Sequence, residues 1–159
     1  MHYNFYTANE KDVDDRLSKE LGRNFKIRRD CRFEKFNFAI STNQFKSLKF
    51  RINIYEIEDD LPGSLIISDN IIFELKDEIS GWQSIDLDPY NVYVDKEVKE
   101  VLISIQWLES EKETKDSKFF AIPASTSPLH QIYYREKAMD EWKVQMGSLS
   151  MYIDAMCSS

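Results

Sequence analysis

The stretch from Phe33 to Glu58, FEKFNFAISTNQFKSLKFRINIYEIE, decides the fold. It holds two runs in which large apolar residues alternate with polar ones. Successive side chains of an extended strand point to opposite faces, so a period of two predicts a half-buried β-strand. The stretch therefore predicts two strands whose inward faces are Phe36, Phe38 and Ile40 in the first and Phe50, Ile52 and Ile54 in the second.

Short alternating runs continue outward from this stretch, separated by turn signals. The clearest is Val101–Leu108, with Val101, Ile103, Ile105 and Trp107 inward. Asp59–Gly63 places Gly after Pro, which predicts a type II turn. About ten short strands without a helical repeat predict one all-β domain spanning residues 1–159, an antiparallel β-sandwich of the jelly-roll or galactose-binding-like kind.

The first 22 residues are the part of this domain that the pattern leaves open. Met1–Ala8 alternates weakly and predicts an edge strand. Asn9–Leu21 carries three apolar residues spaced by four, which fits a short helix, but a solvated loop fits equally well. Gly22 is expected to end this segment, and Asn24–Arg29 to resume an alternating strand.

Composition and charge exclude several classes of protein. The chain of 159 residues is 42% hydrophobic and 13% aromatic, which is ample for a folded core. Its formal net charge of −7 lacks the basic footprint that a nucleic-acid binder needs. The local run of basic residues within 26–32 is interpreted as a solvated strand end, so nucleic acid is not an expected partner.

Two further observations concern location. No apolar stretch approaches the ~20 residues of a membrane-spanning helix. The first residues lack the basic start and apolar middle of a signal peptide. The chain is therefore expected to be soluble, and either cytoplasmic or a fragment whose export signal has been removed. The spacing of Cys31 and Cys157 excludes a CxxC metal site, and Cys157 continues an apolar series that suggests a buried thiol; a disulfide between them is the alternative.

Catalytic and metal-binding patterns are absent from the sequence. The only histidines are His2, at a terminus, and His130, in an expected loop, and there is neither HExxH nor GxSxG. The acidic groups Glu58–Asp60 and Asp86–Asp88 could bind a structural Ca²⁺, although turn chemistry and solubility explain them better. No catalytic residue, no cofactor and no enzymatic activity are expected.

Surface recognition is what remains. The second strand of the opening stretch carries Arg51, Asn53 and Tyr55 on its polar face, and Val101–Leu108 carries Ser104 and Gln106. If the two strands are neighbours, these side chains form a patch of donors, acceptors and an aromatic platform that suits a sugar. Arg51, Asn53, Tyr55 and Gln106 are therefore the candidate ligand-binding residues. The alternative is that they are the solvated face that any sandwich shows.

The three tryptophans receive different interpretations. Trp107 is in phase with its apolar neighbours and is expected in the core. Trp82 opens a strand and is expected to pack under the adjoining turn. Trp142, near Tyr133, Tyr134 and Arg135, is expected to form an aromatic rim or to close one end of the sandwich.

Several segments together resemble a family. In chain order they are ELGRNFKIRRD from Glu20, FRINIYEIEDDLPGSLI from Phe50, NIIFEL from Asn70, GWQSIDLDPYNVYVD from Gly81, VLISIQWLES from Val101 and YYREKAMDEWK from Tyr133. They are similar to the C-terminal β-domain of Bacteroidota proteins called carboxypeptidase-like regulatory-domain proteins. More loosely, the order of strand, Pro-Gly turn and Trp-x-x-x-Asp-Leu is similar to galactose-binding-like jelly rolls.

This resemblance implies an extracytoplasmic domain, periplasmic or at the cell surface, without catalytic residues. It implies a non-catalytic accessory or binding module, with carbohydrate as the first ligand class to test. The alternative is a structural or protein-interaction domain that packs on a partner domain of a larger protein. An enzyme is the third and weakest hypothesis.

Overall fold

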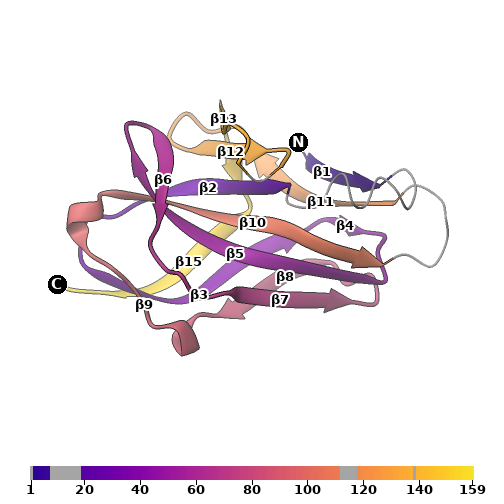
Figure 1. The fold of residues 1–159 in the computed structure, drawn as a ribbon, viewed down its shortest axis with the longest axis horizontal. Coiled ribbons are helices and arrows are strands. Elements are labelled where there is room, and N and C mark those ends of the chain that lie inside the picture. The colour runs from indigo at the N-terminus through magenta and orange to yellow at the C-terminus, as the bar shows by residue number, and fades with distance from the viewer. Residues whose placement is uncertain (1, 8–18, 112–117, 138) are drawn as a thin grey trace.

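Antiparallel pairing of β5 (Ser47–Glu58) with β10 (Glu100–Glu111) forms the centre of the fold, and β10 pairs on its other side with β2 (Glu20–Lys26). The register sets Ile54 opposite Ile103 and Phe50 opposite Trp107, so the apolar residues of both strands share one face. Figure 1 shows these strands crossing the computed structural model, which describes residues 2–7, 19–111, 118–137 and 139–159.

These three strands belong to a seven-stranded antiparallel sheet. Beyond β2 its order continues with β12 (Gln131–Arg135) and β13 (Lys143–Met146). The free side of β5 pairs with β6 (Leu61–Leu65) at one end and with β7 (Ile71–Lys76) at the other.

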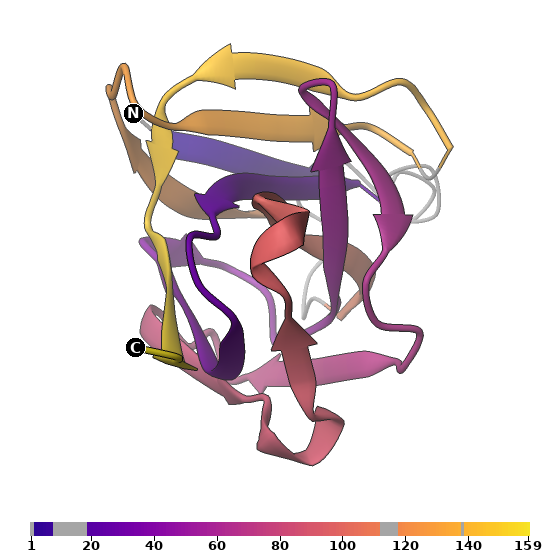
Figure 2. The same ribbon diagram turned by 90° about the vertical axis from the view of Figure 1, so that its left-hand side faces the viewer.

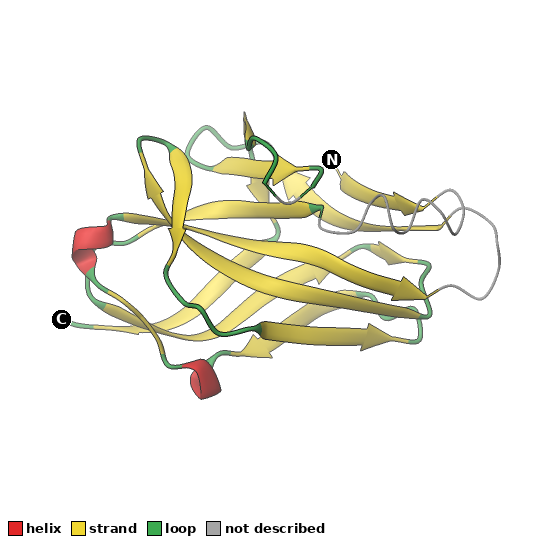
Figure 3. Cartoon of the chain, viewed as in Figure 1, coloured by secondary structure: helices red, strands yellow, loops and turns green. Residues whose placement is uncertain are grey.

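The opposing layer is made of two smaller sheets. In one, β3 (Cys31–Ile40) lies between β15 (Met151–Cys157) on one side and β8 (Gly81–Asp86) with β9 (Val92–Val94) on the other. In the other, β11 (Lys118–Ser125) pairs with β1 (His2–Thr7), β4 (Thr42–Asn43) and β14 (Ser148–Leu149). Backbone bonds from Ser41 N to Ala121 O, 2.9 Å, and from Ser150 N to Pro123 O, 2.9 Å, join the two. The layers curl around one core (Figures 2 and 3).

Aromatic side chains fill the space between the layers. Phe38 on β3 contacts Phe50 on β5, with ring centroids 6.3 Å apart, and Phe50 contacts Phe120 on β11 at 5.3 Å. The ring centroids of Trp107 and Phe120 are 5.4 Å apart, and Trp107 is fully buried. Edge-to-face contacts of this kind add to the area that large rings remove from water. The core expected from the alternation is confirmed, Trp107 included.

The antiparallel β-sandwich is confirmed, and two local expectations are wrong. Gly22 does not end a segment but lies inside β2, between Ser104 of β10 and Tyr133 of β12. The hairpin turn after β5 is made by Asp59 and Asp60, which both have positive φ as a type I′ turn requires, and the Pro-Gly pair lies in β6 instead. Proline is tolerated in β6 because this is an edge strand.

The N-terminal expectations are tested only in part. Among the strands that the structure describes, β1 pairs only with β11, which confirms the edge strand expected within Met1–Ala8. Residues 8–18, which hold most of the segment expected as a short helix or a loop, lie outside the described residues. Two short 3₁₀-helices, η1 (Asp88–Tyr90) and η2 (Lys96–Val98), flank β9. In the described part of the chain no helix is long and apolar enough to cross a membrane.

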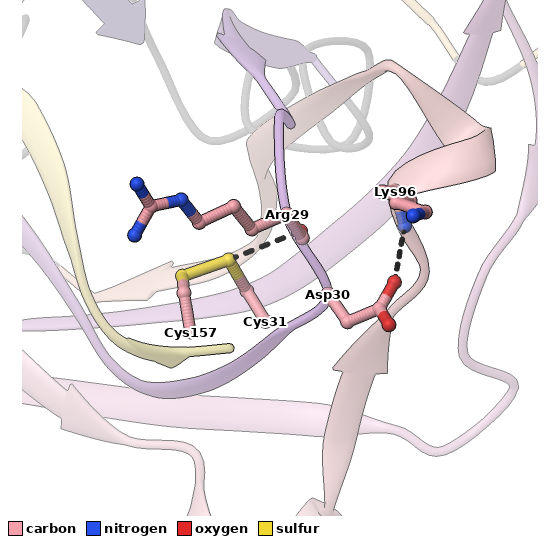
Figure 4. The surroundings of a disulfide bond; sticks show 5 residues. All are labelled: Arg29, Asp30, Cys31, Lys96 and Cys157. Carbon is pink, nitrogen blue, oxygen red and sulfur yellow. Dashed lines mark hydrogen bonds between the residues drawn. A yellow bond between two sulfur atoms is a disulfide. The ribbon is translucent and has the colours of Figure 1, made fainter. Parts of the chain in front are cut away.

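A disulfide joins Cys31 at the start of β3 to Cys157 at the end of β15, so the buried thiol expected for Cys157 is wrong and the alternative is confirmed. Figure 4 shows its surroundings, with the Cys31 sulfur 3.3 Å from the Arg29 carbonyl oxygen. The adjacent Asp30 accepts a hydrogen bond from the backbone N–H of Lys96, 2.9 Å, which ties η2 to the start of β3.

Gly22 gives the first prediction. A Cβ added there would collide with the backbone oxygen of Ile103 and lie 2.8 Å from the Ser104 Cα. Gly22→Ala should lower the free energy of unfolding by about 1–3 kcal/mol, measured by urea denaturation. Gly63→Ala is the matched control because its nearest atom is 3.6 Å away. Equal stability of the two variants would contradict the close approach of β2 and β10.

The disulfide gives the second prediction. It links residues 126 positions apart, so its removal should destabilise the fold by about 2–5 kcal/mol. The double variant Cys31→Ala/Cys157→Ala should melt below the wild-type protein, and dithiothreitol should lower the melting temperature of the wild type only. If the reductant lowers both melting temperatures equally, its effect does not act through this bond.

Candidate functional site

The polar residues of β5 and β10 lie side by side, as the sugar-binding hypothesis required. Ser104 is opposite Asn53, and Gln106 is opposite Arg51. They do not form an open surface, however. Asn53, Ser104 and Gln106 are buried, and Tyr55 is almost so. The expectation of a solvated face is therefore wrong for these residues, because other side chains cover this side of the sheet.

The carboxylate of Glu20, at the start of β2, is the centre of this buried network, and it is 0% exposed. Its Oε2 accepts hydrogen bonds from Tyr55 Oη at 2.8 Å, from Asn53 Nδ2 at 3.0 Å and from Ser104 Oγ. Its Oε1 accepts from Arg135 Nε at 3.1 Å and Nη2 at 2.9 Å. Strands β2, β5, β10 and β12 thus all contribute to one buried ion pair.

Arg135 and Trp142 cover the network. The Arg135 guanidinium carbon lies 4.3 Å from the centroid of the Trp142 ring, and Nη2 also donates to Tyr55 Oη at 3.3 Å. The Trp142 ring is edge-on to Tyr55, at 5.7 Å. Trp142 therefore covers this side of the sheet, which is neither of the two roles expected for it. It packs on a small apolar cluster of Tyr55, Ile57, Leu102 and Tyr133.

This geometry is that of a stabilising buried ion pair rather than of a reactive group. A buried ion pair persists only when hydrogen bonds satisfy its remaining atoms, and every oxygen of Glu20 has at least two donors. Burial and the neighbouring carboxylate raise the pKa of Tyr55, so its hydroxyl stays a donor rather than a nucleophile. Burial and the charges of Glu100 and Asp60 likewise raise the pKa of Tyr133 to about 12.

Arg51 lies at the margin of the network. Its side chain is partly exposed, but its Nε is buried without a hydrogen-bond partner among the atoms that the structure describes. Gln106 does not satisfy it, because Gln106 Oε1 accepts from Asn53 at 3.1 Å instead. The ligand-binding role of Arg51, Asn53, Tyr55 and Gln106 remains a prediction. The last three of these residues are buried in the hydrogen-bond network around Glu20.

The outer face of β8, β3 and β15 presents a different arrangement. Trp82 is 58% exposed and Tyr152 is 46% exposed, and they meet edge-to-face with centroids 5.2 Å apart. Trp82 is opposite Ala39 on β3, so the small alanine side chain leaves the indole uncovered. The expectation that Trp82 packs under a turn is wrong.

Polar groups surround this aromatic pair. Tyr152 and Ser84 flank Asn37 across the sheet, and Asn37 Nδ2 donates to the Asp154 carboxylate at 3.1 Å. Lys35 is exposed on the same face of β3. The surface thus combines an exposed aromatic platform with fixed hydrogen-bonding groups on neighbouring strands.

The acidic groups and histidines considered as possible ligands are next. In the ranges that the structure covers, no group of three or more His, Cys, Asp or Glu side chains could hold a metal ion. Asp86 caps its own turn by accepting from the Asp88 N–H at 3.0 Å. His130 Nδ1 lies 2.9 Å from Ser127 Oγ, which confirms a hydrogen-bonded loop histidine, and His2 lies in β1.

Comparisons with protein-family models, with curated proteins and with solved structures find no match to this chain.

Sequence reasoning missed Glu20 and the exposure of Trp82. Leu21, Arg23 and Phe25 occupy every second position, which could have indicated a strand beginning at Glu20. On such a strand Glu20 points to the opposite side from Leu21, beside the polar face of β10. The pattern of Gly81–Asp86 could have placed Trp82 outward, since Ile85 is the inward residue of that strand.

The buried ion pair gives the third prediction. Glu20→Gln should lower the free energy of unfolding by about 3–5 kcal/mol because it leaves Arg135 without its counter-charge. Glu58→Gln is the control, since Glu58 is exposed at the end of β5 and its loss should stay within about 0.5 kcal/mol. A double-mutant cycle with Arg135→Met should show coupling above about 1 kcal/mol. Additive effects would mean that the pair does not interact.

Proposed function

We propose that this chain is a non-catalytic binding module for carbohydrates and that the outer face of β8, β3 and β15 is its binding surface. The observation that carries the proposal is the exposed pair of Trp82 and Tyr152 on the outer face of this sheet. Sugar rings have apolar C–H faces that pack on aromatic rings, and hydroxyls that need hydrogen-bonding partners.

The surroundings of the pair support a polar ligand over an apolar one. Asn37 is buried and donates to Asp154 at 3.1 Å, so it holds the exposed Asp154 carboxylate in place before a ligand arrives. The exposed Lys35 and Asp86 are opposite each other on β3 and β8 and add charged groups within the same face. A preorganised set of this kind reduces the entropy lost on binding.

The face of β5 and β10 is the weaker choice for the same ligand. Asn53 Nδ2 and Tyr55 Oη already donate hydrogen bonds to Glu20, and the stacked side chains of Arg135 and Trp142 cover them. A sugar would have to open this network before it could bind. We therefore move the proposed site from Arg51, Asn53, Tyr55 and Gln106 to Trp82 and Tyr152.

An extracytoplasmic location, periplasmic or at the cell surface, is part of the proposal. It rests on the resemblance to carboxypeptidase-like regulatory-domain proteins of Bacteroidota, which remains a prediction. The disulfide of Cys31 and Cys157 supports it, because disulfides persist chiefly in oxidising compartments.

A protein-interaction domain is the second candidate function. The observation that favours it is β13, an edge strand whose four residues are all exposed and include the apolar Val144 and Met146. Edge strands with free backbone groups are ready to pair with another chain. Under this hypothesis the partner packs against β13.

The fourth prediction tests the carbohydrate proposal with the purified domain on a glycan array, followed by titration calorimetry of the best ligand. Trp82→Ala and Tyr152→Ala should each weaken binding about 2- to 10-fold, since losing an aromatic contact costs about 0.5–1.5 kcal/mol. Leu61→Ala removes a similarly exposed apolar side chain from the β5–β6 hairpin and should change nothing.

Failure to bind any glycan would overturn the carbohydrate proposal. Binding that survives Trp82→Ala and Tyr152→Ala unchanged would overturn the choice of surface. In the first case, Val144→Lys on β13 tests the second candidate, because a charge there should abolish association with a partner domain without unfolding an already exposed strand.

A further inference from the structure

A cavity opens where the pairing of β2 is incomplete. β12 accompanies β2 from Glu20 only as far as Arg23, which is opposite Ile132. Beyond it, Asn24 to Lys26 keep β10 on one side and have no strand partner on the other in the described part of the chain. A cavity of about 390 Å³ lies here, and the lining side chains that matter below are Arg23, Phe25, Lys26, Arg28 and His130.

A second cavity, of about 320 Å³, adjoins the first. It extends between the end of β2 and strands β3 and β15, and Cys31 and Cys157 are in its wall. Both cavities share Arg23, Phe25 and Lys26. Arg23 therefore stands between two hollows at the open side of the sandwich.

The Arg23 guanidinium is fixed in position. Its Nη1 donates to the Met151 carbonyl at 2.8 Å and its Nε to the Asn24 carbonyl at 3.2 Å, and the group lies 4.3 Å from the centroid of the Phe25 ring. These partners are neutral, and Arg23 has no ion pair with any residue that the structure describes. Burial lowers its pKa, as expected for a cation that is incompletely compensated.

Further positive charge surrounds Arg23. Lys26 and Arg28 are exposed at the mouth of the cavity, and neither forms an ion pair within the described ranges. Burial and the charges of Arg23 and Lys26 lower the pKa of His130. The one acid opposite Lys26 on β10 is Glu100, and its Oε2 accepts from Asn24 at 2.8 Å.

We infer that this cavity binds the carboxylate or sulfate group of an acidic sugar. Charge complementarity carries the inference, because a fixed guanidinium and two more cations converge on one hollow in a chain whose net charge is −7. Arginine presents a planar fork that matches an oxyanion, and the Phe25 ring under the Arg23 guanidinium lines the cavity beside it. The volume lies within the ordinary range of small-ligand pockets.

The inference stands apart from the proposed function. Neither Trp82 nor Tyr152 lines the first cavity, but Tyr152 lines the adjoining second cavity, so Trp82→Ala rather than Tyr152→Ala separates the two sites. One site can fail while the other is intact. Trp82→Ala should leave binding in this cavity unchanged, which makes the two proposals separable in one set of variants.

The fifth prediction is tested by ¹⁵N NMR titration of the full chain with sodium glucuronate and with glucose, at constant ionic strength. Glucuronate should give saturable shifts at residues 23–28 and 129–130, and glucose should give none. Arg23→Gln should weaken binding about 10-fold or more, and Lys26→Gln and Arg28→Gln about 3- to 10-fold each, as expected for lost charge-assisted contacts. The control is Lys76→Gln, a remote exposed lysine.

Arg23→Gln also removes the hydrogen bond to the Met151 carbonyl and can unfold the chain. Lys26→Gln and Arg28→Gln therefore keep the test decisive. Equal shifts with glucose and glucuronate, or equal losses in Lys76→Gln and Arg28→Gln, would overturn the site. A third arm uses sodium sulfate and sodium acetate. Binding of either as tight as glucuronate would show that the anion alone is recognised and would overturn the sugar assignment.

Discussion

The buried carboxylate of Glu20 is the constraint on which the seven-stranded sheet depends. A charge without access to water must have donors, and Glu20 draws them from β5, β10 and β12 at once. A slip of one residue in β2 would place Leu21 where Glu20 is and leave Arg135 unpaired. Because the side-chain period of a strand is two, this single group fixes the register of three strand pairs.

The same constraint determines which surfaces are available for recognition. Arg135 and Trp142 cover the polar face of the large sheet, where Trp142 packs on a small apolar cluster. This face is therefore not an open surface. On the outer face of β8, β3 and β15, Trp82 and Tyr152 are exposed, although Asn37 and Ala39 between them on β3 are buried. The end of β2, where β12 stops, is another place at which polar groups line a hollow. Both proposed binding surfaces therefore lie outside the region that the Glu20 network covers.

Much of the fold could be predicted from the sequence, because alternation is a local property. The inward faces of β3, β5 and β10 follow directly from Phe36, Phe50 and Ile103. The network could not be predicted in the same way, since Glu20 meets Ser104 across 84 residues and Arg135 across 115. Nothing local distinguishes a polar strand face that is covered from one that is solvated. The type I′ turn at Asp59 and Asp60 was obscured by the Pro-Gly pair that follows it.

The Cys31–Cys157 bond has a mechanical consequence. A force that pulls a terminal strand away from its sheet at one end breaks the backbone hydrogen bonds one after another. Here a pull on Ser159 passes through two sulfur atoms to the start of β3, which is held by β15 on one side and by β8 and β9 on the other. β15 therefore cannot be separated from β3 at this end while the bond is intact.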